Sequence, residues 1–308
     1  MKYIRRINRF FIISVILISV IYFIFISIKF KLSDTISSAA DARFGDYVGG
    51  YIGTIFAFIS ILLLLENLRN QRGSDIKQAF ENKYFTMIEL HRKNVEEMEL
   101  GEAKGRKVFV LLTREWREIM KEMRAIMARS SCFLNQRDFI EISYLCLFFG
   151  TGPNSSRMLR SYLSGFDKIF INELVNRLSS RRLKNSVNKR RKLGYTPFEG
   201  HQSRLGHYYR HLYQAISYID EQDHDLDKYE YAKTIRAQLS THEQALLLLN
   251  SLTLLGWPWW LNGFMSEYMM IRNIPEHFFD EDTELYLKIL YKESGIYFEW
   301  QTIDPRIY

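Results

Sequence analysis

Two long apolar segments lie near the N-terminus, at residues 10–28 and 47–65, and neither contains a charged side chain. As α-helices, each would be about 28 Å long, close to the ~30 Å thickness of the hydrocarbon core of a bilayer. The segment between them is short and polar, so two spans joined by it must run antiparallel. The pattern therefore predicts a two-helix transmembrane hairpin over residues 1–68.

Basic residues that flank the spans set the expected orientation. Those outside the pair are Lys2, Arg5, Arg6, Arg9, Arg69, Arg72 and Lys77, and those between the spans are Lys29, Lys31 and Arg43. The positive-inside rule then places both termini of a multi-pass membrane protein in the cytoplasm. A cleaved signal peptide is the alternative, but the first apolar segment is longer than usual for one, and a second span follows it.

Glycines recur every four residues around the start of the second span, at Gly45, Gly49 and Gly53. On an α-helix this spacing gives a stripe without side chains, against which another helix can pack closely. The stripe would meet either the first span of the same chain or another subunit of a homo-oligomer. Both arrangements stay open.

The pattern after the second span is helical almost throughout. Residues 69–100 predict a helical stalk, in which Gly73 is expected to bend or break the helix and Ser74 to cap the next one. Residues 101–308 predict a cytoplasmic domain with helices at about 106–129, 136–149, 166–185, 203–220, 227–252, 258–272 and 281–293. Loops are expected at 151–156 and 193–200, and a short strand near 296–300. The predicted fold class is mainly α, with an N-terminal transmembrane hairpin followed by an all-α domain.

Composition predicts a packed interior and a net positive charge. Aromatic residues make up 15 % of the chain, and the formal net charge is +7. The charge favours an acidic partner, either anionic lipid or nucleic acid. Cys132 and Cys146 are too few for a disulfide framework and are expected to be buried thiols. Because no residues show metal-ligand spacing, we expect neither a metal site nor a cofactor.

A run of basic residues without any acid lies between residues 177 and 192. Its members are Arg177, Arg181, Arg182, Lys184, Lys189, Arg190, Arg191 and Lys192. The run could bind the phosphates of a nucleic acid or lie on anionic lipid. It could also be a solvated helix end without a partner, and the three interpretations stay open.

Polar side chains interrupt the apolar faces of the helices predicted at 203–220 and 227–252. They are His207, Arg210, His211, Arg236, Gln238 and Glu243. If the two helices pack side by side, these residues could converge in a pocket or a buried network. Ordinary polar residues, satisfied within the helix packing, are the favoured alternative.

Helical ribonucleases of the HEPN type carry an arginine followed a few residues later by a histidine. Three pairs have compatible spacing, namely Arg204/His211, Arg236/His242 and Arg272/His277. Such a short pattern arises by chance in an arginine-rich chain, and Pro275 would break the helix that the last pair needs. Walker, GxSxG and HExxH motifs are absent from the sequence. We therefore expect no catalytic residues and a protein that is not an enzyme.

Four segments, in their order along the chain, resemble a known family. They are GDYVGGYIGTIFAFISILLLLENLRNQR, AFENKYFTMIELHRKNVEEM, LGHYYRHLYQAISYID and YAKTIRAQLSTHEQALLLLNSL. Together they resemble the phage abortive infection proteins of bacteria, the AbiC-like group, and the two-span membrane effectors of retron defence systems. The resemblance implies that infection makes the host cell stop growing or die. In the retron version it also implies a partner complex of reverse transcriptase and non-coding RNA.

Three functional hypotheses follow. In the first, a phage-derived trigger activates the cytoplasmic domain, and the hairpins assemble through the glycine stripe and disrupt the inner membrane. In the second, the protein is a membrane-tethered ribonuclease with His211, His242 or His277 as the base. In the third, a non-catalytic membrane-bound module binds a nucleic-acid complex through the basic run.

Overall fold

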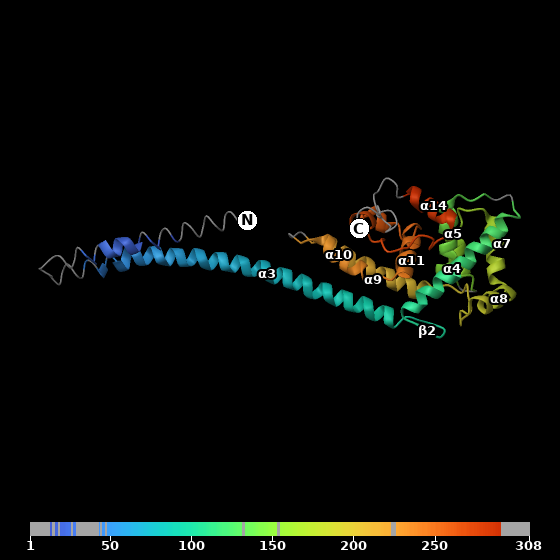
Figure 1. The fold of residues 1–308 in the computed structure, drawn as a ribbon, viewed down its shortest axis with the longest axis horizontal. Coiled ribbons are helices and arrows are strands. Elements are labelled where there is room, and N and C mark those ends of the chain that lie inside the picture. The colour runs from blue at the N-terminus through green and yellow to red at the C-terminus, as the bar shows by residue number, and fades with distance from the viewer. Residues whose placement is uncertain are drawn as a thin grey trace. The chain divides into compact units, whose positions relative to one another are not determined.

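A computed structural model describes residues 13, 16, 17, 19–25, 27, 28, 43, 45, 46, 48–130, 133–152, 155–222 and 226–290. The chain divides into two compact units, residues 1–81 and residues 82–308, and each is described by itself. Figure 1 shows the elements of both units. The described residues are mainly helical, which confirms the predicted mainly α class.

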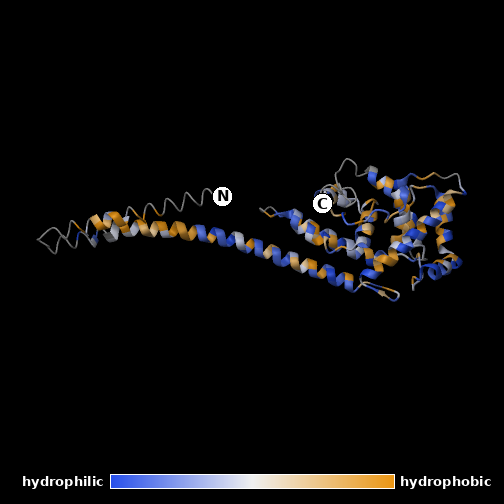
Figure 2. Cartoon of the chain, in the orientation of Figure 1, coloured by the Kyte–Doolittle hydropathy of each residue, from blue (hydrophilic) through white to orange (hydrophobic). Residues whose placement is uncertain are grey.

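The N-terminal unit contains the apolar start of a long helix. A π-helical turn, η1 (Val48–Ile52), leads into α3 (Gly53–Glu96). Among the described residues, α3 is the one helix that length and composition would allow to cross a membrane. Leu62, Leu63, Leu64 and Leu65 cover a full helical turn, and each exposes 40 % or more of its surface. The first part of α3 is therefore apolar on all sides (Figure 2).

The predicted hairpin is described only in part. Its first span, residues 10–28, is described at residues 13, 16, 17, 19–25, 27 and 28, and these positions are helical. The connecting residues 29–42 lie outside the described residues. The two-span hairpin therefore stays a prediction.

Of the predicted bend or break at Gly73, the break was wrong, and so was the prediction that Ser74 caps a new helix. Helix α3 runs through both residues without interruption. One glycine in a helix costs only about 1 kcal/mol relative to alanine. Helix-forming residues on both sides outweigh that cost, and Lys77 forms an i,i+4 ion pair with Glu81 at 3.7 Å.

The described part of the C-terminal unit consists of short helices and one small β-hairpin. The hairpin, which the sequence analysis did not predict, pairs β1 (Glu99–Leu100) with β2 (Ala103–Lys104) in antiparallel fashion. The helices are α4 (Arg106–Met127), α5 (Gln136–Phe149), α6 (Ser156–Tyr162), α7 (Lys168–Ser179), α8 (Arg181–Arg191), α9 (Gln202–Asp220), α10 (Lys228–Arg236), α11 (Thr241–Ser251), α12 (Pro258–Leu261), α13 (Phe264–Glu267) and α14 (Glu281–Leu290). Helices α4, α5 and α9 match the predicted bounds closely, whereas α6 was not expected.

Helix α4 lies at the centre of this unit and packs against α5, α7 and α11 (Figure 1). Its inner face buries the apolar residues Val108, Phe109, Leu112, Trp116 and Ile119. The indole of Trp116 is fully buried and donates its Nε1–H to Ser143 Oγ at 2.9 Å. A large ring with its polar atom satisfied gives the core a fixed centre.

The helices predicted at 166–185 and 227–252 are each divided in two. Helices α7 and α8 meet at Ser180, whose φ of −62° and ψ of 121° are extended rather than helical. Helices α10 and α11 are separated because Ser240 and Glu243 form a capping box that starts α11. A helix cannot continue through its own N-cap, so each prediction of one long helix was wrong.

The prediction of one helix over residues 258–272 was also wrong. The expected helix is replaced by α12, α13 and an irregular segment. Gly263, with φ of 73°, turns the chain between the two short helices. The following segment is held by the buried side chain of Gln244, whose Oε1 accepts hydrogen bonds from the backbone N–H groups of Arg272 and Asn273 at 3.0 Å.

Two glycines let the loop before α9 cross the end of α5. Gly150 has φ of 75° and Gly200 has φ of 90°. A Cβ at Gly150 would lie 2.2 Å from the backbone N of Gly200, and one at Gly200 would lie 2.1 Å from the backbone O of Phe149. Only residues without a side chain allow this approach. The crossing carries residues 195–201 over the core.

Of the two cysteines, Cys146 is fully buried in α5 as a free thiol, as predicted. Burial raises the pKa of this thiol to about 12, which keeps it protonated and unreactive. Cys132 lies outside the described residues, as do residues 291–293 and the short strand predicted near residues 296–300.

Candidate functional site

Three glutamates on the buried face of α4 hold the basic run and the loop after it in place. Glu115 and Glu118 are completely buried, and Glu122 is 5 % exposed. Their spacing of three and four residues puts them on one face of the helix. A buried carboxylate is costly unless it is paired, and the partners come from α7, α8 and the loop that follows α8.

Glu118 is paired with Arg190 and Arg191, and Glu122 is paired with Arg177. Burial on its own would raise the pKa of Glu118. The hydrogen bonds from Arg191 and Arg190 outweigh that effect and hold the pKa below its ordinary value. Glu118 therefore stays charged, and its two arginines are fixed against α4.

Glu115 collects hydrogen bonds from the loop that crosses α5. Its carboxylate accepts from the hydroxyl of Tyr195 and, at 2.8 Å, from the backbone N–H of Phe198. His201 Nε2 lies 3.1 Å from the same carboxylate. Burial and the neighbouring carboxylate together raise the pKa of Tyr195, so its hydroxyl remains a donor. Glu115 is thus a structural group rather than a free acid.

Helix α8 consequently has two kinds of basic residue. Val187 faces the core, and the flanking cations Lys184, Arg190 and Arg191 are paired with acids, Lys184 with Glu199. The remaining cations of the run are exposed and have no ion-pair partner among the described residues; they are Arg181, Arg182, Lys189 and Lys192. At 100° per residue Arg181, Arg182 and Lys189 lie opposite Val187 on α8, and Lys192 is the C-cap that follows the helix. We call these four residues the outer face of α8.

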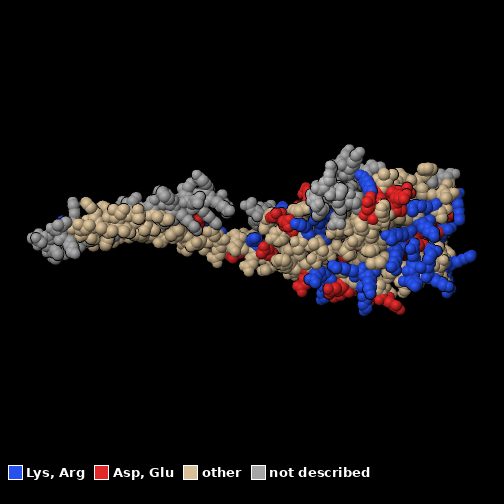
Figure 3. All heavy atoms as spheres, viewed as in Figure 1, with Lys and Arg blue, Asp and Glu red and all other residues tan. Residues whose placement is uncertain are grey.

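Cations from α4 lie close to this helix. Burial lowers the pKa of Arg117, and the nearby charges of Arg191 and Arg114 lower it further. Figure 3 shows Lys and Arg side chains gathered over the end of the C-terminal unit that holds α4, α7 and α8. The positive surface predicted from one segment is therefore built from two helices, and only part of that segment faces solvent.

The six polar residues proposed for one pocket do not converge. Arg236 is buried and donates to the backbone carbonyls of Tyr268 and Met269 at 3.1 and 2.7 Å. Glu243 caps α11 and accepts from the hydroxyl of Tyr208 at 3.2 Å. These two side chains are satisfied within the helix packing, as the favoured alternative expected.

The other four residues are spread over α9 and the turn before α11. His207 and Arg210 are exposed, and His211 is half-buried. Gln238 lines a small cavity of about 230 Å³ at the junction of α3 and α4, together with His91 and Arg106.

His91 is a buried histidine that the sequence analysis did not single out. It is 4 % exposed, and neither ring nitrogen has a hydrogen-bond partner among the described residues. Its ring packs 5.2 Å from that of Tyr208 and 6.4 Å from that of His211. Burial first, and then the charges of His211 and Arg106, lower the pKa of His91 to about 4. The imidazole is therefore neutral at pH 7.

The arginine–histidine pairs differ in their surroundings. In the Arg236/His242 pair, the arginine is bound to carbonyl oxygens, and the capping box separates the two residues. Arg272 and His277 lie outside helices. Arg204 and His211 share α9 but stand two turns apart, and Arg204 Nε donates to the backbone O of Glu99 at 2.7 Å.

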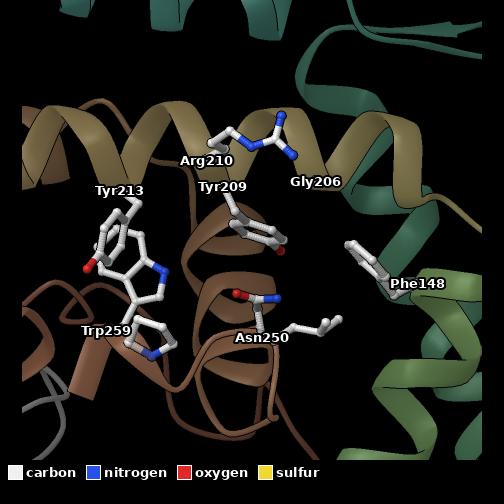
Figure 4. A pocket seen from close by; sticks show the side chains of 9 residues that line it. Phe148, Gly206, Tyr209, Arg210, Tyr213, Asn250 and Trp259 are labelled. Carbon is white, nitrogen blue, oxygen red and sulfur yellow. The ribbon is translucent and has the colours of Figure 1, made fainter. Parts of the chain in front are cut away.

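A cavity of about 380 Å³ lies beside α9. It is lined by Phe148, Gly206, Tyr209, Arg210, Tyr213, Asn250, Leu255, Pro258 and Trp259. Figure 4 shows Tyr213 and Trp259 on one side, Phe148 on the other, and Tyr209 and Asn250 between them. Of the predicted pocket residues, only Arg210 belongs to it.

The predicted glycine stripe lies on an exposed part of the N-terminal unit. A Cβ built at Gly45, Gly49 or Gly53 meets no described atom within 4 Å. The turn η1 contains Gly49, so the path from Gly45 to Gly53 is not one regular α-helix. The stripe thus differs in local geometry from the prediction, and no described residue covers it.

The comparisons with known proteins bear on the segment that contains α9 to α13. Residues 200–279 match the sequence model of the family described as "Putative phage abortive infection protein". This match confirms the predicted resemblance to the abortive infection proteins over these residues. The searches of curated proteins and of solved structures each found no match.

The matched segment, residues 200–279, includes all but one of the residues that line the cavity beside α9. Sequence reasoning missed the cavity because Phe148 and Asn250 come from helices far apart in the chain. It also missed the α4 acids, although a signal existed. Glu115 and Glu122 fall on the same helical stripe as Leu112 and Ile119, where a solvated acid would not be expected.

Proposed function

We propose that this protein is a membrane-bound effector of phage defence that acts by abortive infection. The family match of residues 200–279 supports the role in defence. The apolar start of α3 supports a location in the membrane, because an uncharged helix segment exposed on all sides is unfavourable in water. The segment from Val48 to Leu65 would be roughly 27 Å long, enough to cross the hydrocarbon core.

In this proposal, activation of the C-terminal unit allows the N-terminal segments to associate and damage the inner membrane. Gly45, Gly49 and Gly53 have no described atom within 4 Å of a built Cβ, and such small residues support close approach of helices from neighbouring subunits. The partners are inner-membrane lipid and further copies of this chain. Both termini lie in the cytoplasm in this arrangement.

The test compares leucine at two adjacent glycines. Gly49→Leu places a bulky side chain on the stripe, whereas Gly50→Leu places the same bulk beside it. Growth arrest after phage infection should be lost with Gly49→Leu and kept with Gly50→Leu, at equal amounts of membrane-inserted protein. Equal protection by both variants would contradict assembly through the stripe.

A second candidate function is supported by the outer face of α8. Four exposed cations without ion-pair partners among the described residues favour a polyanion, and each phosphate contact makes binding more sensitive to salt. A nucleic-acid complex, such as a reverse transcriptase with its non-coding RNA, is the proposed partner. Charge reversal at Arg181 and Lys189 should release such a complex without changing membrane insertion. Retention of the complex by this variant would exclude the outer face.

The ribonuclease alternative has less support. The described arginine–histidine pairs include one whose arginine is bound to carbonyl oxygens and one that lies outside helices. His211 is the remaining candidate base. His211→Ala should leave phage protection unchanged if the protein acts on the membrane, and loss of protection with intact folding would revive the alternative.

A further inference from the structure

The cavity beside α9 has the size and shape of a small-molecule site. Its volume of about 380 Å³ falls within the range of roughly 300–1,000 Å³ that is typical of ligand pockets. Helices α5, α9, α11 and α12 all contribute to its walls. Three of its residues are held rigidly, since Phe148, Asn250 and Trp259 each expose 7 % or less of their surface.

Aromatic rings form most of the walls. Tyr213 and Trp259 pack edge to face with ring centroids 5.2 Å apart, and Phe148 stands across the cavity from them (Figure 4). Such an arrangement offers flat apolar surfaces to a ligand from two sides. Flat aromatic ligands stack on surfaces of this kind, and nucleobases gain about 1–3 kcal/mol per stacked base.

Two polar side chains line the cavity. Arg210 is exposed and has no ion pair or hydrogen bond among the described residues. Its guanidinium could bind a phosphate in a bidentate manner. The side-chain amide of Asn250 lines the floor of the cavity (Figure 4) and offers both a donor and an acceptor, as the edge of a nucleobase requires.

We propose that this cavity binds a nucleotide, with the base between the aromatic walls and against Asn250, and with the phosphate at Arg210. A purely apolar ligand would leave Arg210 without a partner. A bare phosphate would leave the aromatic walls empty. This ligand assignment does not depend on how the N-terminal unit acts.

The experiment is calorimetric titration of the full-length protein in detergent with AMP, GMP, CMP and UMP. Parallel titrations use adenosine, N-acetyltryptophan and a 5′-phosphorylated RNA octamer. We expect at least one nucleotide to bind more tightly than adenosine. Tighter binding of the octamer than of every mononucleotide would identify the end of a nucleic acid as the source of the nucleotide.

Variants show whether binding takes place in this cavity. Arg210→Gln should weaken nucleotide binding about tenfold while leaving adenosine binding unchanged, because only the phosphate contact is removed. Gly206→Leu should abolish binding by filling the cavity. Gly206→Ala is its control, since a Cβ there meets only Phe148 at 3.6 Å. His207→Gln, an exposed neighbour on α9, should bind as the wild type does.

Three outcomes would overturn the assignment. One is the absence of binding by every nucleotide and by the octamer at millimolar concentration, with the protein folded. Another is unchanged binding in both Arg210→Gln and Gly206→Leu, which would place the ligand elsewhere. The third is binding of N-acetyltryptophan as tight as that of the best nucleotide, which would point to an aromatic carboxylate instead.

Discussion

At the scale of single residues, burial decides what each polar group does. Glu115, Glu118 and Glu122 lie in the core, and the carboxylate of each accepts hydrogen bonds from donors in a later part of the chain. His91 differs, because its ring is buried without such partners among the described residues. Positions where two backbone segments cross closely also restrict the residue type, and Gly200 is the clearest of them.

Gly200→Ala should destabilise the protein severely. Alanine at φ of 90° is strained, and its Cβ would stand 2.1 Å from the backbone O of Phe149. We expect the free energy of unfolding to fall by about 3 kcal/mol or more. Gly194→Ala is the matched control, because it has φ of 74° and open space around the Cβ, and it should cost about 1 kcal/mol. Thermal unfolding followed by circular dichroism distinguishes them, and equal losses would contradict the close crossing.

Acid should destabilise the folded protein partly through His91. Between its ordinary pKa near 6.5 and the lowered pKa of about 4, the unfolded chain binds a proton that the folded protein excludes. The free energy of unfolding therefore falls as the pH drops through this window, by about 3 kcal/mol at most. His91→Phe should flatten the dependence of the melting temperature on pH between 7 and 4.5. An unchanged slope would show that His91 titrates normally.

At the scale of elements, one face of α8 packs against the rest of the unit and the opposite face is exposed. Arg190 is paired with buried Glu118, whereas its neighbour Lys189 belongs to the outer face and has no described partner. The same short helix thus stabilises the unit with one side and presents charge with the other.

This division predicts different effects of two adjacent substitutions. Arg190→Ala should lower the free energy of unfolding by about 1 kcal/mol, since the pair is partly exposed to solvent and Arg191 still neutralises Glu118. Lys189→Ala should change stability by less than about 0.5 kcal/mol. Chemical denaturation measures both. A larger loss for Lys189→Ala than for Arg190→Ala would reverse the assignment of the two faces.

Much of the helix pattern could be predicted from the sequence, because apolar spacing reports on burial. Helices α4, α5 and α9 follow such spacing within a residue or two. The boundary at Ser240 was missed although the capping-box pattern of Ser240 and Glu243 is visible in the sequence. The prediction gave the continuous apolar periodicity more weight than the capping box at Ser240. In the structure, the capping box starts a new helix.

The site was less predictable than the fold. Pairing of Glu118 with Arg190 joins residues 72 positions apart, and spacing along one helix carries no information about such a contact. The cavity beside α9 likewise depends on Phe148 from α5. Arg210 was identified as a candidate because it interrupts an apolar face, which is a local property.

At the scale of the whole molecule, the two units have different chemistry. Residues 82–308 contain the segment matched by the family model, the cavity and the basic surface. Residues 1–81 contain the exposed apolar part of α3. In the proposed function the C-terminal unit receives the signal of infection and the N-terminal unit damages the membrane, so loss of either one should abolish protection.

Uptake of a membrane-impermeant dye by infected cells tests this account most directly. Cells carrying the wild-type protein should take up propidium after infection and before phage are released. Cells carrying Gly49→Leu should exclude the dye until lysis, whereas those carrying Gly50→Leu should behave as the wild type does. Phage protection by the wild-type protein in cells that exclude the dye throughout would contradict membrane damage as its mode of action.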